Sequence, residues 1–192
     1  MDSARERLLS EAVDLFYSRG VRAVGIDLII ARAQVAKATF YRHFPSKHRL
    51  VLAYLDRYQY AWLRWLTESI AARARTPGAQ LIAIFDTIGE QFDDPAFHGS
   101  PLVNVVAELG SEFPDVVERS SFHWAELHRY ITQLATAAEV RRPSRLADQW
   151  LLLIEGAYVE AHRSRRSDVA WRAQEIALVL LARYEAGGSA RL

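Results

Sequence analysis

The chain has 192 residues, no cysteine, 51% hydrophobic residues and a formal net charge of +1. This composition is typical of a globular protein, and it excludes a disulfide scaffold, a thiolate zinc site and a cysteine nucleophile. The longest apolar run, residues 176–182, is far shorter than the roughly 20 residues that cross a bilayer, and the N-terminus lacks a secretory signal. We therefore expect a cytoplasmic protein with no membrane contact.

Helical periodicity begins near the N-terminus and continues almost to the end of the chain. Apolar residues at i, i+4 and i+7 spacing from Leu8 predict a first helix that ends at Gly20. Short helical patterns follow at 26–33 and 37–43, and Pro45-Ser46 then breaks the chain, with Ser46 as the N-cap of a long helix to about Arg75.

The rest of the chain continues the pattern without any strand. Further helices are predicted at about 79–93, 102–111, 115–139, 144–165 and 168–186, with prolines 101, 114 and 143 at or just before three of these starts. No segment alternates apolar and polar residues as a half-buried strand does. We predict an all-α protein of about nine helices.

Residues 26–43 form a candidate helix-turn-helix unit, because two short helices are separated by the three-residue turn 34–36 behind a longer first helix. Residues 1–50 also carry 9 Lys or Arg against 5 Asp or Glu, whereas the remainder carries 15 against 18. The second short helix presents Lys37, Thr39, Tyr41 and His43 beside Phe40. Such a face suits a groove lined with phosphates.

The segment IIARAQVAKATFYRHFPSKHRL resembles the DNA-binding signature of the TetR family of transcriptional regulators, over about Leu8 to Val51. The resemblance implies that 37–43 is the recognition helix and that a phosphate also meets Lys47, where a helix N-terminus favours anions. The expected DNA contacts are Lys37, Thr39, Tyr41, His43 and Lys47. We expect a helix-turn-helix domain at 1–46 and a ligand-binding and dimerisation domain at 47–192.

Two positions in the turn depart from the family pattern, and Val24-Gly25 stands near the start of the second helix, where the family commonly has a hydroxyl. Gln34 stands where the family usually has glycine, so this residue must either accept a positive φ or use a different turn. Ala36 stands where a serine usually caps the recognition helix, and a lost cap costs roughly 0.5 to 2 kcal/mol. We expect these changes to alter DNA affinity without removing the motif.

The helical body combines bulky aromatic residues with polar groups that need partners when buried. The stretch 97–108 resembles a segment in TetR regulators that have small-molecule pockets. We predict a pocket for a mainly hydrophobic molecule with one or two polar groups, lined by Trp62, Phe85, Phe92, Phe97, Asn104, Glu108 and His123. Glu108 would favour a cationic or hydroxyl-bearing ligand, and the simpler alternative is that the aromatic residues only form the core.

The last two helices are too apolar to face water. Residues 176–182 are apolar through nearly two turns, and 150–154 with 156–159 repeat the pattern with small residues between. A partner subunit covers such helices more readily than the chain's own fold, and the resemblance implies a four-helix homodimer interface. The predicted interface residues are Trp150, Leu153, Ala157, Ala177, Leu180 and Tyr184.

Other function classes lack supporting motifs. No nucleophile elbow, phosphate-binding glycine loop or HExxH spacing indicates an enzyme, and His123 and His128 are five apart, which does not make a chelating pair. A helical adaptor would give no reason for the pattern at 37–47. We predict no enzyme activity, no cofactor and no metal, but a homodimeric repressor that a small-molecule effector releases from a palindromic operator in double-stranded DNA. The alternative is a DNA-binding regulator without a natural inducer.

Overall fold

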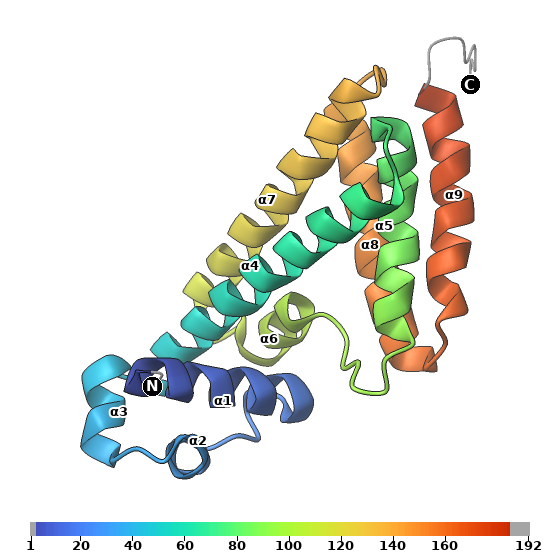
Figure 1. The fold of residues 1–192 in the computed structure, drawn as a ribbon. Helices are drawn as coiled ribbons and strands as arrows, with labels where there is room; N and C mark the ends of the chain where they lie inside the picture. The colour runs from blue at the N-terminus through green and yellow to red at the C-terminus, as the bar shows by residue number, and fades with distance from the viewer. Residues whose placement is uncertain (1–2, 185–192) are drawn as a thin grey trace. The chain divides into compact units, whose positions relative to one another are not determined.

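The computed structural model describes residues 3–184, and the regular secondary structure of this part of the chain is entirely helical (Figure 1). The all-α prediction is confirmed. The nine helices of residues 3–184 are α1 (Ala4–Arg19), α2 (Ile26–Ala33), α3 (Lys37–His43), α4 (Lys47–Arg73), α5 (Pro77–Phe92), α6 (Pro101–Leu109), α7 (Pro114–Ala137), α8 (Pro143–Ser164) and α9 (Asp168–Tyr184).

Prolines and capping side chains explain where these helices begin. Proline is the first residue of α5, α6, α7 and α8, because that position needs no backbone N–H donor. The Thr76 hydroxyl caps α5 by accepting from the N–H of Ala79 at 3.3 Å. The predicted starts therefore agree with the structure to within two residues, and residues 185–186 of the last predicted helix lie outside the described residues.

The chain forms two compact units, Met1–Ala61 with Pro101–Ser121 and Trp62–Ser100 with Phe122–Leu192, named here the first and second unit. The predicted domain boundary between residues 46 and 47 falls at the start of α4. The two compact units divide that helix further along, after residue 61, and also divide α7.

The first unit packs α1 against α2 and α3. The apolar stripe of α1 is buried through Leu8, Ala12 and Leu15, and the inward side of the helix-turn-helix is buried through Ile29 and Phe40. This packing leaves the opposite side of α3 to solvent.

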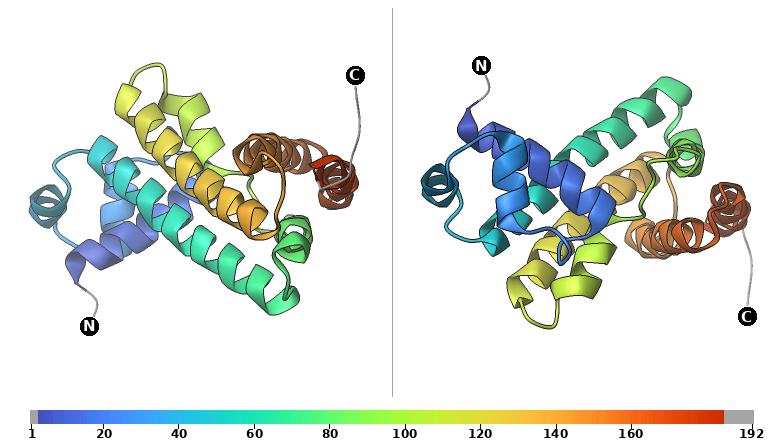
Figure 2. Two further views of the ribbon diagram at one scale, coloured as in Figure 1. Left: turned by 90° about the horizontal axis from the view of Figure 1, so that it is seen from above. Right: turned by 90° about the horizontal axis from the view of Figure 1, so that it is seen from below.

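The second unit packs α5, α8 and α9 side by side, as the views along their axes show (Figure 2). Gly89 lets α5 approach α9 closely, since a Cβ atom there would lie 3.1 Å from the Cβ of Ala170. Trp150 of α8 is fully buried, and its indole Nε1 donates to the carbonyl oxygen of Leu81 at 3.1 Å. None of the described helices combines the length and apolar character needed to cross a bilayer.

Candidate nucleic-acid interface, effector site and dimer surface

The turn between α2 and α3 has the left-handed conformation that glycine usually supplies. Gln34 takes φ 52° and ψ 50°, and the N–H of Val35 donates to the carbonyl of Ile30 at 3.3 Å. A left-handed conformation costs a non-glycine residue roughly 1 to 2 kcal/mol. Ala36 at the N-cap of α3 makes no side-chain hydrogen bond. Of the two alternatives for Gln34 the structure has the positive φ, and the expected loss of the side-chain cap at Ala36 is confirmed.

The recognition-helix candidate α3 has one buried face and one exposed face. Phe40 is fully buried, whereas 45% of Tyr41 is exposed, with its ring edge-on to Phe40 at 5.2 Å. Lys37 is exposed on the same helix, and Thr39 and His43 are half-buried. Tyr41 therefore presents its phenolic group to the surroundings while its ring edge is held by the core.

The exposed face of α3 carries one cation that is already paired and one that is not. The Lys37 ammonium lies 3.1 Å from the Asp27 carboxylate of α2, and this hydrogen bond raises the pKa of Lys37. Arg42 is exposed one residue after Tyr41 and makes no ion pair with any described residue. The sequence prediction missed Arg42, although its place beside Tyr41 in the motif was the available signal.

Lys47 lies at the first turn of α4, where Ser46 caps the helix by accepting from the N–H of Arg49 at 3.2 Å. Its ammonium lies 6.0 Å from the ring centroid of Phe16, and burial lowers the pKa of Lys47. No carboxylate among residues 3–184 forms an ion pair with it. A helix N-terminus with an unpaired ammonium is suited to a phosphate.

Glu108 of α6 holds the turn that follows α1, which differs from its predicted role in a ligand pocket. Its carboxylate accepts from the backbone N–H of Val21 at 3.2 Å and of Arg22 at 2.8 Å. The Arg22 guanidinium donates to the Glu108 carbonyl at 2.8 Å and pairs with Glu112. At Gly20, with φ 79°, an added Cβ would lie 2.9 Å from the carboxylate. Because backbone donors occupy this carboxylate, we leave Glu108 out of the effector site.

A second contact in the first unit joins the start of α4 to the start of α7. The Nε2 atom of His48 lies 2.7 Å from the Asp115 carboxylate, and the imidazole stacks on the Phe113 ring at 4.3 Å. The hydrogen bond with His48 lowers the pKa of the Asp115 carboxyl.

Three of the predicted pocket residues meet in one aromatic cluster of the second unit. The ring centroid of Phe92 lies 5.0 Å from the ring centroids of both Phe97 and Tyr158. The Trp62 indole Nε1 donates to the Tyr158 hydroxyl at 2.8 Å. The Tyr158 hydroxyl in turn donates to the Gln91 side chain. Sequence reasoning missed Tyr158 and Gln91, because nothing in the local pattern separates them from other helical residues. We name these five residues the aromatic cluster.

The remaining predicted pocket residues lie elsewhere. Phe85 packs on Trp150 at 6.0 Å, and the fully buried His123 lies 3.3 Å from the Glu126 carboxylate. Asn104, like Glu108, belongs to α6 in the first unit, whereas the aromatic cluster is in the second. Within residues 3–184, no three His, Cys, Asp or Glu side chains are grouped so that they could hold a metal ion.

The predicted dimer residues of α8 and α9 point mostly into the protomer. Trp150, Ala157 and Ala177 are buried against the protomer's own helices, and Leu153 is half-buried. Leu180 and Tyr184 are half-buried and line a cavity. Other large apolar residues of α8 and α9 face outward, each between about half and three quarters exposed: Leu152, Val159, Trp171, Ile176, Leu178 and Val179. An apolar run along a helix does not indicate which side packs inward, so the sequence alone could not separate the buried faces of α8 and α9 from their exposed faces.

Comparisons with known proteins by sequence and by structure agree with one another. Residues 8–54 match the family model described as bacterial regulatory proteins of the tetR family. The crystal structure of SCO4454, a TetR-family transcriptional regulator from Streptomyces coelicolor, is 30% identical, has a TM-score of 0.80, and covers 93% of this chain and 96% of its own.

Two curated regulators are also similar. The transcriptional regulator AcuR of Cereibacter sphaeroides is 27% identical over 176 residues, which cover 86% of this chain and 79% of AcuR. The HTH-type transcriptional repressor NemR of Escherichia coli is 28% identical over 114 residues, which cover 59% of this chain and 56% of NemR.

Proposed function

The chain belongs to the TetR family of transcriptional regulators, and from this premise we propose that it is a homodimeric repressor that a small, mainly hydrophobic molecule releases from a palindromic operator. Regulators of this family bind DNA, generally dimerise and are not enzymes. The relative NemR is named a repressor, which supports the proposed direction of regulation. The place of action is the cytoplasm, where a bacterial operator lies.

The observation that carries the DNA-binding proposal is the exposed face of α3. Tyr41 and Arg42 are exposed there, and neither side chain is needed to fill the core. Lys37, Thr39 and His43 lie on the same helix. Lys47 follows at the start of α4, and no carboxylate of the described residues forms an ion pair with it. We assign phosphate contacts to Lys37, Lys47, Tyr41 and His43, and a base-edge contact to Thr39, because its methyl and hydroxyl groups suit thymine.

The experiment begins with selection of an operator from a random duplex library, followed by affinity measurements over a range of salt concentrations. Tyr41→Ala should weaken operator binding strongly while the thermal unfolding curve stays unchanged, because the exposed phenol contributes little to the core. Lys47→Ala should weaken all sequences alike and reduce the salt slope by about one unit.

Matched controls are available on α4. Tyr60 is 54% exposed and Arg64 is a solvent-exposed cation, so Tyr60→Ala and Arg64→Ala repeat the two changes away from α3. Normal operator affinity in Tyr41→Ala, or a loss as large in Tyr60→Ala, would contradict the assignment of α3 as the recognition helix. An unchanged salt slope in Lys47→Ala would remove that contact.

The dimer surface we propose combines α8 and α9. Leu152 and Val159 are seven residues apart on α8, and Ile176 and Val179 are three apart on α9, so each pair lies on one helix face. All four side chains are at least half exposed. Gly156, between the two α8 residues, is exposed, and a Cβ added there would meet nothing within 4 Å, so a partner helix could approach closely.

The effector site we propose is the aromatic cluster. Its rings offer apolar contact area, and the hydrogen-bonded chain from Trp62 through Tyr158 to Gln91 offers polar groups that an effector could exchange for its own. An effector that enters must displace this internal packing, so its binding would favour a changed arrangement of the second unit.

The test is a thermal-shift screen of aromatic and amphiphilic compounds, followed by operator-release measurements on the hits. Release by wild-type protein that is lost in Tyr158→Phe and Phe97→Leu, but kept in Phe122→Leu at an exposed position, would support this site. Release that is unaffected by both cluster variants would contradict it. The alternative, a regulator without a natural inducer, predicts that the cluster variants change only stability.

A further inference from the structure

A strongly cationic cavity lies within the second unit, where the ends of α7 and α9 meet the start of α8. Its volume is about 330 Å³, and its lining residues are Arg141, Arg142, Arg145, Gln149, Leu180, Arg183 and Tyr184. Four of these residues are arginines, which stay charged at all physiological pH values, and no Asp or Glu of residues 3–184 is among the lining side chains. The cavity therefore combines four positive charges with a phenol and an aliphatic wall.

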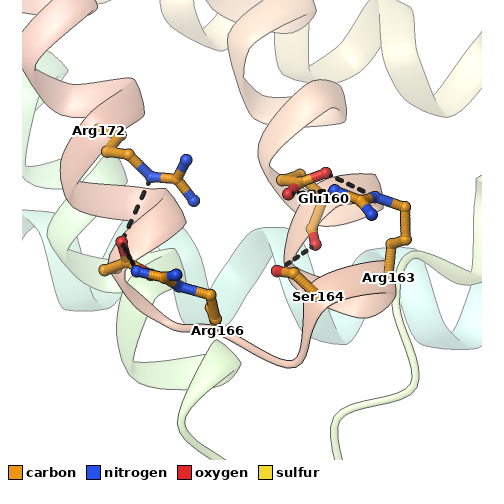
Figure 3. A network of polar contacts seen from close by, with 6 residues as sticks. Glu160, Arg163, Ser164, Arg166 and Arg172 are labelled. Atoms are coloured by element: carbon orange, nitrogen blue, oxygen red, sulfur yellow. Dashed lines mark hydrogen bonds and ion pairs between the residues drawn. The ribbon is translucent and has the colours of Figure 1, made fainter.

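These arginines differ from those at the opposite end of α8. At the α8–α9 connection, Arg163 pairs with Glu160 at 2.7 Å, and Arg166 and Arg172 pair with Asp168 at 2.8 and 3.4 Å (Figure 3). The chain thus places carboxylates beside the arginines of that connection, so its high arginine content is not by itself a reason for unpaired charge.

At the cavity, three of the four arginines lack such a carboxylate partner among the described residues. Arg142, Arg145 and Arg183 form no ion pair with any residue from 3 to 184. Arg141 is engaged differently, since its backbone N–H donates to the carbonyl of Tyr184 at 3.0 Å and fixes the end of α9. Three guanidinium groups around one hollow repel one another unless an anion joins them, and the planar fork of each matches two oxygens of a phosphate.

Two further features support a ligand. The Oε1 atom of Gln149 is buried and has no hydrogen-bond partner among residues 3–184, which leaves an acceptor for a hydroxyl or amino group. Arg142 holds the left-handed conformation, with φ 58°, as the residue that precedes α8. This conformation costs a residue with a Cβ about 1 to 2 kcal/mol, which the surrounding contacts must offset.

We propose that this cavity binds a small organic phosphate that also carries a hydroxyl or amino group. Arg142, Arg145 and Arg183 hold the phosphate oxygens, and Gln149 accepts a hydrogen bond from the donor group. The occupant is a small molecule and not a DNA backbone, because the groups line a hollow that includes the buried Oε1 atom of Gln149. The site is separate from the aromatic cluster and from α3, so it does not depend on the proposed function above.

The test is isothermal titration calorimetry on the full-length protein with ribose 5-phosphate, inorganic phosphate and ribose at constant ionic strength. We expect ribose 5-phosphate to bind more tightly than inorganic phosphate, by about fivefold for one hydrogen bond, and ribose alone not to bind. Arg145→Gln should weaken both phosphates by about tenfold or more, since a charge-assisted contact is lost. Gln149→Leu should remove only the preference for the ester.

The matched control is Arg166→Gln, which removes an exposed arginine at the opposite end of α8 and should leave phosphate affinity unchanged. An equal loss in Arg145→Gln and Arg166→Gln would show that the phosphate senses only overall charge and would overturn the site. No detectable binding of either phosphate would also overturn it. A loss of random-duplex DNA affinity in Arg145→Gln that matches the loss of phosphate affinity would assign the patch to DNA instead.

Discussion

Replacement of Glu108 by alanine tests whether this carboxylate holds the turn after α1 or waits for a ligand. The substitution removes the acceptor for two backbone N–H groups, those of Val21 and Arg22. Arg22 is exposed and water can replace the lost bond, whereas Val21 is only 2% exposed and its N–H is left without an acceptor. A hydrogen bond to a charged group contributes about 1.5 to 3 kcal/mol, so we expect a loss of about 2 to 3 kcal/mol in the free energy of unfolding.

The assay is equilibrium urea unfolding followed by circular dichroism, with Glu112→Ala as the matched control. Glu112→Ala removes a carboxylate just beyond the end of α6. It loses only an ion pair with Arg22, in which each side chain is about half exposed. Such pairs contribute at most about 1 kcal/mol. Amide hydrogen exchange at Val21 gives a local readout and should accelerate in Glu108→Ala alone.

The opposite result would restore the ligand interpretation. A carboxylate kept for a ligand costs stability in the unliganded protein, so its removal would leave the free energy of unfolding unchanged or raise it. If Glu108→Ala loses no more stability than Glu112→Ala, the turn does not depend on this carboxylate and our account of α6 is wrong.

Three further predictions concern the turn, the α4–α7 contact and the dimer. Gln34→Gly should raise the free energy of unfolding by up to about 1 kcal/mol and Gln34→Val should lower it, because only glycine accepts the positive φ without strain; urea unfolding measures both. Asp115→Asn should lower the melting temperature at neutral pH, and the difference should shrink as the pH falls through the pKa of Asp115, which the hydrogen bond with His48 lowers, because the wild-type carboxyl then also becomes protonated. An equal difference in melting temperature at neutral pH and at a pH where Asp115 is protonated would contradict the role of the Asp115 charge. Val179→Glu should convert the dimer to monomer in sedimentation, whereas Gln133→Glu on α7 should not, and a stable Val179→Glu dimer would move the interface elsewhere.

The helices could be predicted from local chemistry because their signals are local. A proline that needs no N–H donor, a serine that can cap, and apolar residues every three or four positions all act within one or two turns. Pro101 and Pro143 therefore marked helix starts correctly, whereas for Gln34 the sequence left open a positive φ or a different turn, and the structure has the positive φ.

The partners of individual side chains could not be predicted in the same way. Glu108 binds the backbone 86 and 87 residues away, and no local pattern separates such an acceptor from a ligand-facing carboxylate. Trp150 was assigned to the dimer surface because its whole segment is apolar, yet its indole donates to Leu81 inside the protomer. A helix that is apolar on several sides gives no indication of its rotation, which the neighbouring helices decide.

The pairing of Lys37 with Asp27 affects how the protein would search a chromosome. A phosphate that reaches Lys37 must displace a carboxylate that already neutralises it, at 3.1 Å. The displaced carboxylate then recruits a cation from solution, which cancels part of the counterion release that drives non-specific attachment. Random DNA offers phosphates alone, so its binding free energy gains little from this exchange. An operator that also contacts Tyr41 and Thr39 would offset the cost of displacing Asp27. If Lys37 contacts a phosphate as proposed, Asp27 would shorten the time spent on non-operator sequences and leave more of the protein free to find the operator.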